Sequence, residues 1–297
     1  MVAFLTYVLY RFVAALTGPL PPRAGYWLAR RVGALLYIFS PHLRRVVTHN
    51  LDHVLGPEAS DAELEAAVRR ALVNIAKGHY DLFRVSRLTK EEIRALVDVD
   101  GMPEFLQMLE SGQGAVVITA HLGNIDIVGQ TPLIHGVPIT GAVEHIQPER
   151  LFRYLLKLRQ SHGLQLLPSD GSMLGLFRAL KRGEIVALPC DRGFADNARF
   201  VEFFGRPARL PDGAVRIALR TGAPLVPAFV QRRSDDRFLI EIEPPLELSR
   251  SGDLEADVAD GVKKVAAVME RYISRRPEQW LVAAPVWPMD GAEGANA

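Results

Sequence analysis

Between residues 115 and 242 the sequence alternates short apolar runs with segments of helical periodicity, and this alternation restricts the possible folds more than any other feature. Each apolar run has the length of one strand, whereas the segments between them place apolar residues three and four positions apart. Strands that alternate with helices form a layered α/β domain. We therefore predict an α/β fold with a mixed, partly parallel central sheet flanked by helices. The expected strands are 115–119, 138–143, 164–167, 185–188, 225–230 and 238–242, and the expected helices are 62–84, 125–134, 149–162, 173–182, 213–221 and 254–274.

The N-terminal region has a different character. Residues 1–20 are largely apolar and carry one charge, Arg11, and residues 26–40 repeat this style. The first stretch is borderline for a transmembrane helix, the second is too short, and a signal peptide fits poorly. We expect a membrane-associated helical hairpin, with a buried hairpin inside the domain as the alternative. The arginines expected to face anionic headgroups are Arg11, Arg23, Arg30, Arg31, Arg44 and Arg45.

The chain as a whole is expected to divide into three parts. Residues 1–60 would hold the membrane-associated helices, and residues 61–288 the α/β domain. Residues 289–297 are small and polar, which predicts a disordered tail.

Composition excludes several classes of function. The net charge of +1 gives no general reason to expect nucleic acid as a partner. The single cysteine, Cys190, rules out a disulfide framework and a cysteine-rich zinc site. His49 and His53 have the spacing of metal ligands on a helix, but no third ligand accompanies them. We therefore expect no metal.

Chemistry-bearing residues follow the first apolar run, in the segment 114–130 (GAVVITAHLGNIDIVGQ). His121 would lie at the carboxyl end of a buried strand, where open α/β sheets place their sites. Gly123 permits a tight turn, and Asn124 suits a helix N-cap. Asp126 would then fall in the first helical turn, within reach of the His121 ring. A carboxylate on one imidazole nitrogen leaves the other free to accept a proton, which predicts a general-base dyad.

The His-x4-Asp motif resembles the signature of the lysophospholipid acyltransferase superfamily, and within it the bacterial lipid A biosynthesis (lauroyl/myristoyl) acyltransferase family. Glu144 and residues 147–152 (QPERLF) are similar to the phosphatidylinositol mannoside acyltransferase branch. The further stretches that carry the resemblance are 44–51 (RRVVTHNL), 158–163 (LRQSHG), 191–193 (DRG), 200–205 (FVEFFG), 221–227 (TGAPLVP) and 277–280 (PEQW).

The resemblance implies an O-acyltransferase that needs no cofactor. His121 would deprotonate a hydroxyl of a glycolipid acceptor, which then attacks an acyl thioester of coenzyme A or of acyl carrier protein. N–H groups of the turn at Gly123, together with Arg159, would stabilise the oxyanion or the anionic donor. The expected location is the cytoplasmic face of the inner membrane, as a peripheral or monotopic protein in contact with membrane lipids.

Other candidate substrate-binding residues follow later strands. Glu144 comes after the second expected strand and would bind acceptor hydroxyls. Asp191 and Arg192 follow the run 185–188 and would position the acceptor headgroup or the donor phosphates. Phe204 would line an acyl tunnel.

Four alternatives remain at this point. Cys190 adjoins the candidate site and could be a nucleophile paired with a histidine, although a lone cysteine is more often a small buried apolar residue. Water in place of the lipid hydroxyl would give a thioesterase, and a glycerolipid acceptor would give a lysophospholipid acyltransferase. A non-catalytic lipid-binding protein would not need the His121–Asp126 pair.

Overall fold

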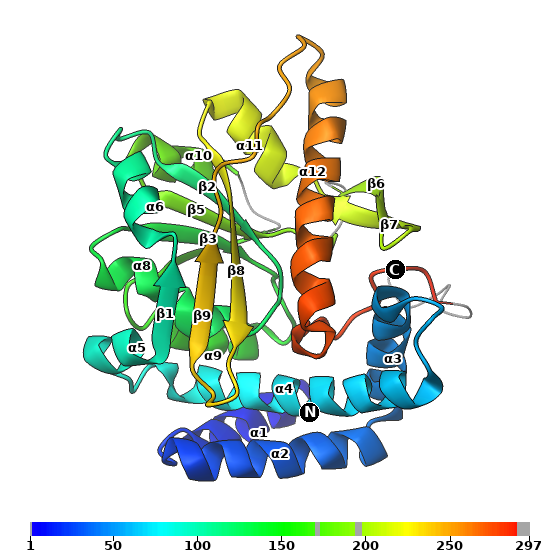
Figure 1. Cartoon of the computed structure of the whole chain (residues 1–297). Helices are drawn as coiled ribbons and strands as arrows, with labels where there is room; N and C mark the ends of the chain where they lie inside the picture. Colours follow the sequence, from blue (N-terminus) through cyan, green and yellow to red (C-terminus); the bar gives the residue numbers. More distant parts are fainter. Residues whose placement is uncertain (1, 170–172, 194–197, 290–297) are drawn as a thin grey trace.

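The computed structural model describes residues 2–169, 173–193 and 198–289. Its centre is a seven-stranded sheet with the order β1-β9-β8-β2-β5-β3-β4 (Figure 1). All neighbouring strands are parallel except β8 and β9, which are antiparallel. The sheet is therefore mixed and mostly parallel, as predicted. The strands are β1 (Val97–Asp100), β2 (Ala115–Thr119), β3 (Ile139–Val143), β4 (Gln165–Pro168), β5 (Ile185–Pro189), β8 (Leu225–Arg232) and β9 (Phe238–Ile242).

Helices cover both faces of the sheet because its central strands are apolar on both sides. Val116 and Ile118 of β2 pack in one core with α10, α11 and α12, whereas Ala115 and Val117 pack in another with α6. Alternate residues of a strand point to opposite faces, so β2 is buried on both. The helices after β1 are α6 (Met102–Leu109), α7 (Ile125–Val128), α8 (Thr131–Ile134), α9 (Glu149–Arg159), α10 (Leu174–Lys181), α11 (Gly213–Thr221) and α12 (Leu254–Arg275), followed by the short helix η2 (Pro277–Gln279).

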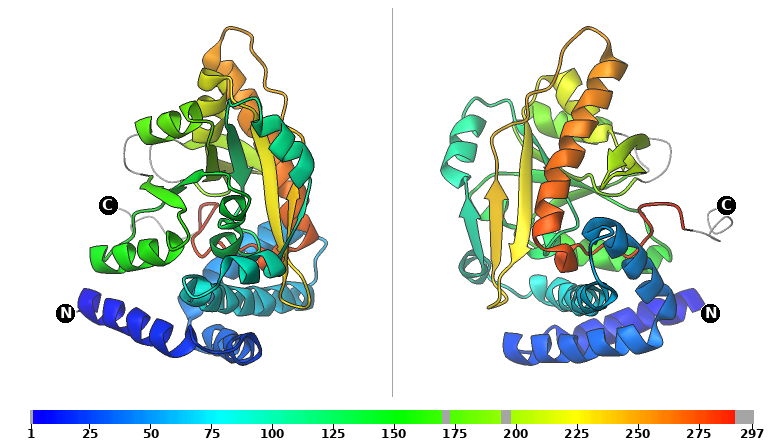
Figure 2. Two further views of the ribbon diagram at one scale, coloured as in Figure 1. Left: turned by 90° about the vertical axis from the view of Figure 1, so that its left-hand side faces the viewer. Right: turned by 45° about the vertical axis from the view of Figure 1, so that its right-hand side comes forward.

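Five helices precede the first strands of the sheet. Figures 1 and 2 show α1 and α2 on the outside of α4, which runs beneath the sheet. α4 begins with a capping box, in which Ser60 and Glu63 satisfy each other's backbone N–H groups. Among the described residues no helix is both long and apolar enough to cross a membrane. These helices are α1 (Val2–Thr17), α2 (Pro22–Phe39), α3 (Pro41–Leu55), α4 (Asp61–Val85) and α5 (Lys90–Leu96).

Most expected elements are present, and the structure adds elements that were not predicted, among them β1, α5 and α6. The helix expected over 125–134 is divided into α7 and α8, which are separated by Gly129 and Gln130. Residues 198–211 form an antiparallel hairpin, β6 (Ala198–Phe203) and β7 (Arg206–Pro211), which the sequence analysis did not predict. The expected disordered tail, apart from Met289, lies outside the described residues.

The topology also determines where polar side chains can gather. β2, β5, β3 and β8 run in the same direction, and Figure 1 shows that the arrowhead of β8 points toward α4. The carboxyl ends of these strands therefore lie at the edge of the sheet nearest α4. This is the edge at which open α/β sheets bind their ligands.

Candidate active site

His121 and Asp191 lie side by side at the carboxyl ends of two adjacent strands. β2 and β5 are in register with Thr119 opposite Pro189, and each of the two side chains comes two residues later. His121 Nδ1 lies 2.8 Å from Asp191 Oδ1, and the His121 backbone N–H donates to Asp191 Oδ2, also over 2.8 Å. An ionised carboxylate only accepts, so Nδ1 carries the proton and Nε2 keeps its lone pair in the neutral ring.

The surroundings of this pair change both pKa values. Asp191 is fully buried, and Trp280 Nε1 donates to its Oδ2 over 2.7 Å. Burial raises the pKa of Asp191, but His121 and these hydrogen bonds outweigh burial and leave the pKa below its ordinary value. Burial lowers the pKa of His121, and the Asp191 charge outweighs it, so the His121 pKa lies above 6.5 although Arg192 and Arg159 oppose the rise. The Asp191 charge therefore stabilises the imidazolium form of His121.

Asp126 is paired with Arg159, which corrects the expected dyad. Arg159 Nε donates to Asp126 Oδ1 over 2.7 Å. Gln130 Nε2 strengthens this arrangement by donating to the backbone carbonyls of both Asp126 and Arg159. The reason is spatial: α9 brings Arg159 to the first turn of α7, while β5 brings Asp191 to the His121 ring. Asp126 therefore orients an arginine beside His121.

Glu144 and Arg192 form a second ion pair at the same edge of the sheet. Glu144 follows β3, which is the neighbour of β5, and Arg192 follows Asp191. Arg192 Nη2 lies 2.8 Å from each Glu144 carboxylate oxygen. Both side chains are partly exposed, 23% for Arg192 and 38% for Glu144, so they can contact a polar ligand near His121.

The turn between His121 and α7 is held by its neighbours. Gly123 has a φ of +66°, and a Cβ there would meet the Val230 carbonyl oxygen at 2.8 Å. Its N–H donates to the Gln279 carbonyl over 3.0 Å, so this group is already engaged and is not available to an oxyanion. Asn124 caps α7 as predicted, because its Oδ1 accepts from the N–H groups of Asp126 and Ile127.

Cys190, the alternative nucleophile, is unreactive, and Phe204 lies away from this polar edge. Cys190 is buried, and burial followed by the Asp191 charge raises its thiol pKa, so the thiolate that a nucleophile requires is disfavoured. Phe204 packs against Phe203 and Trp287, with ring centroids 4.8 and 6.3 Å away. It lies in that aromatic cluster and not among the residues that line the two cavities described next.

A cavity opens beside His121. Asn124, Asp126 and Arg159 line it, and α4 contributes His79 and Gly78. His79 was not predicted, because a histidine on an amphipathic helix carries no distinguishing signal. Trp280 lies in the run PEQW, but its contact with Asp191 was not predicted either. We call this space the His121 cavity.

A second, apolar cavity lies between the sheet and helices α6 to α8. Its walls include Val117, Phe105 and Leu166, and Ile125 lines both this cavity and the His121 cavity. This lining is almost entirely apolar, which suits the chain of a fatty acyl group better than a polar ligand.

Together these features describe a site for proton abstraction next to an apolar binding space. Nε2 of His121 can accept a proton, and Asp191 stabilises the imidazolium that results. Arg159 supplies positive charge inside the His121 cavity. The groups suit attack by a hydroxyl on an activated acyl group, with no nucleophilic side chain required.

Comparison with known proteins agrees with this chemistry. A family model described as bacterial lipid A biosynthesis acyltransferase matches residues 1–288. The phosphatidylinositol mannoside acyltransferase of Mycolicibacterium smegmatis is 28% identical over 252 residues, which cover 84% of this chain and 81% of the relative. The protein of that name from Mycobacterium tuberculosis is 27% identical over 256 residues, covering 84% of this chain and 78% of the relative.

Proposed function

Because the chain belongs to the bacterial lipid A biosynthesis acyltransferase family and is therefore an acyltransferase, we propose that it transfers a fatty acyl chain from an acyl thioester to a hydroxyl of a phosphatidylinositol mannoside-type glycolipid. The observation that carries this proposal is the His121–Asp191 pair, in which His121 lines a cavity with polar groups that adjoins an apolar cavity. The mannoside acceptor is favoured by the names of the two mycobacterial relatives.

The proposed reaction is one direct transfer. The acyl chain lies in the apolar cavity, and the acceptor hydroxyl lies in the His121 cavity. His121 Nε2 takes the hydroxyl proton while the oxygen attacks the thioester carbonyl carbon, and Arg159, held by Asp126, faces the negative charge of the tetrahedral intermediate. The carbon–sulfur bond then breaks, and the imidazolium returns its proton to the leaving thiolate. Glu144 and Arg192 would contact the polar part of donor or acceptor.

The test is an acyl-transfer assay on purified protein. Labelled palmitoyl-CoA or palmitoyl carrier protein is supplied with phosphatidylinositol mannosides, a lipid A precursor or a lysophospholipid, and products are identified by mass spectrometry. We expect acylated mannoside from at least one donor. Release of free fatty acid without acylated lipid would indicate a thioesterase, and acylation of the lysophospholipid alone would reject the glycolipid acceptor.

We further propose that α1 and α2 bind the cytoplasmic face of the membrane without crossing it. α1 exposes large apolar side chains at helical spacing, among them Phe4 (53% exposed), Leu9 (59%) and Phe12 (65%). α2 adds Trp27 (57%) and Phe39 (74%), and exposed arginines accompany both helices. An amphipathic helix of this kind lies in the interface, and each cationic side chain near an anionic surface adds about 1 kcal/mol.

Replacing Phe4, Leu9 and Phe12 together by serine is expected to release the protein from vesicles of phosphatidylglycerol and phosphatidylcholine. Flotation at low and high salt measures the effect, and binding that survives high salt would indicate that apolar insertion dominates, since salt weakens only the electrostatic part. Phe200→Ser is the matched control, because Phe200 is 72% exposed but lies on β6. If the unmodified protein stays unbound at both salt concentrations, the membrane proposal is wrong.

A further inference from the structure

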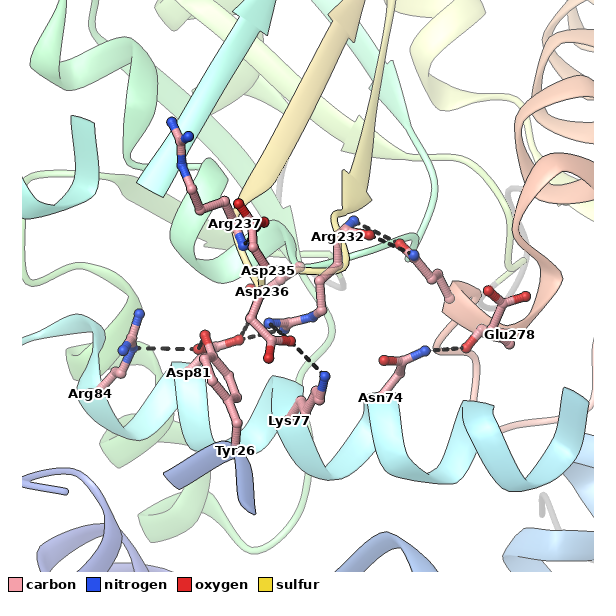
Figure 3. A network of polar contacts seen from close by, with 12 residues as sticks. Tyr26, Asn74, Lys77, Asp81, Arg84, Arg232, Asp235, Asp236, Arg237 and Glu278 are labelled. Atoms are coloured by element: carbon pink, nitrogen blue, oxygen red, sulfur yellow. Dashed lines mark hydrogen bonds and ion pairs between the residues drawn. The ribbon is translucent and has the colours of Figure 1, made fainter. Parts of the chain in front are cut away.

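A buried carboxylate on α4 receives hydrogen bonds from three separate parts of the fold. Asp81 is fully buried. Its Oδ1 accepts from the Tyr26 hydroxyl of α2 over 2.8 Å. Its Oδ2 accepts from Asn124 Nδ2 over 2.9 Å and from the Arg232 guanidinium at the end of β8. Figure 3 shows the Asp81 side chain beside those of Tyr26, Arg84 and Arg232. The mechanism proposed above uses neither Asp81 nor Arg232.

The contacts continue from Arg232 back to the catalytic turn. The Arg232 N–H donates to Gln279 Oε1 over 2.7 Å, and Gln279 Nε2 donates to the Arg232 carbonyl over 2.8 Å. The Gln279 carbonyl in turn accepts from the N–H of Gly123. Since Gly123 and Asn124 are consecutive, the contacts form a closed ring. We call it the turn ring; its members are Asp81, Gly123, Asn124, Gln279 and Arg232.

The turn ring holds the turn that directly follows His121. Asp81 accepts only, so it selects the orientation of Asn124 in which the amide nitrogen faces inward and Oδ1 faces the start of α7. Gln279 fixes Gly123 on the other side, and the next residues extend this attachment, because the Leu281 N–H donates to the His121 carbonyl over 2.7 Å. The backbone from the His121 carbonyl to Asn124 is therefore constrained.

A contribution to stability alone does not explain why this pair is charged. Asp81 is fully buried and Arg232 is 6% exposed. Removing charges of this kind from water offsets much of their attraction, and apolar replacements of buried ion pairs are often neutral or stabilising. Polar groups that fix one arrangement of a turn do have an effect that apolar groups cannot reproduce, because only they direct the Asn124 amide.

We propose that Asp81 and Arg232 are positioning residues for the acyl transfer, and that they act through the turn ring on His121. The inference rests on the proposed role of His121 as the base. It also gives α2 a link to the site, because Tyr26 is bonded to Asp81. The expected signature is a loss of kcat with an unchanged KM for donor and acceptor, since Asp81 and Arg232 line neither cavity and act only on the orientation of the base.

The experiment compares two adjacent arginines in the full-length protein. Arg232→Met keeps the backbone bonds to Gln279 and leaves Arg84 beside Asp81, with Arg84 Nε 3.4 Å from Asp81 Oδ1. We expect kcat to fall roughly 10–100-fold, the range for a small displacement of a catalytic group, at a temperature where the protein is folded. Arg233→Met is the matched control with unchanged kcat, because Arg233 pairs with Asp98 on the exposed surface. Arg232→Lys should restore part of the lost kcat, and a purely structural residue would show no such recovery in folded protein.

Asp81→Asn is the second variant to measure if Arg232→Met does not fold. It keeps the shape of the Asp81 side chain and removes the carboxylate charge. A folded Arg232→Met or Asp81→Asn protein with normal kcat would overturn the inference, and so would a changed KM at normal kcat. His121→Ala is measured in parallel. If His121→Ala is as active as the unmodified protein, the proposed function fails; if it is inactive while the variants of the turn ring remain fully active, only the turn ring proposal fails.

Discussion

His121→Ala is expected to lower kcat for acyl transfer by roughly 10²–10⁴-fold, the usual contribution of a general base. The imidazole Nε2 is the only atom of the His121–Asp191 pair that can take the acceptor proton, because Nδ1 is held by Asp191. The fold should survive, since His121 is 30% exposed and follows the strand instead of filling its core. Turnover of labelled acyl thioester, together with thermal unfolding monitored by circular dichroism, measures both effects.

Cys190→Ser is the control for this prediction. Cys190 lies next to Asp191, so the substitution perturbs the same strand end without touching the base. Its activity should stay near that of the unmodified protein, because the buried thiol donates only to the Leu188 carbonyl, which a hydroxyl can also do. Activity lost in folded Cys190→Ser but kept in His121→Ala would reverse the assignment and make the thiol the reacting group.

The strands that carry the site were predictable because their residues leave few alternatives. The run 115–119 is apolar and β-branched, and the structure has β2 over the same residues. The run 185–188 became β5 with one residue added. By contrast β1 (VDVD) alternates apolar and charged residues over only four positions, and the hairpin β6–β7 contains arginines, prolines and a central glycine. Such segments become strands through pairing with their neighbours, which local pattern does not reveal.

The partner of His121 could not be predicted because it depends on the order of the strands. Sequence spacing places Asp126 five residues after His121, and this proximity favoured it as the partner. Asp191 is 70 residues away in the chain, and only the pairing of β2 with β5 brings it to the ring. The sequence did show that both His121 and Asp191 follow buried strands. It did not show that those two strands are adjacent.

Asp191→Asn is expected to lower kcat nearly as much as loss of the histidine does. The substitution favours the tautomer of His121 with its proton on Nε2 in place of Nδ1. His121 N–H and Trp280 Nε1 both donate to Oδ2, so the amide oxygen of an asparagine would occupy that position. The amide NH₂ would then face His121 Nδ1 and donate to it. The neutral ring would carry its proton on Nε2 and could not accept another there. A carboxamide that enforces the wrong tautomer costs about 10⁴-fold in the serine protease triad, which sets the expected scale.

The pH dependence of kcat/KM for Asp191→Asn gives a second, independent reading. The base must be neutral to act, so activity rises with pH through the pKa of His121. In the unmodified protein that pKa lies above 6.5, because Asp191 outweighs burial. Without the Asp191 charge, burial, Arg192 and Arg159 all lower the pKa of His121, and the acidic limb of the profile should move to lower pH.

Asp126→Asn is the matched control, since Asp126 contacts Arg159. This variant should reduce activity less and leave the acidic limb nearly in place. A limb that moves in Asp126→Asn but not in Asp191→Asn would show that Asp126 is the partner of the base during turnover.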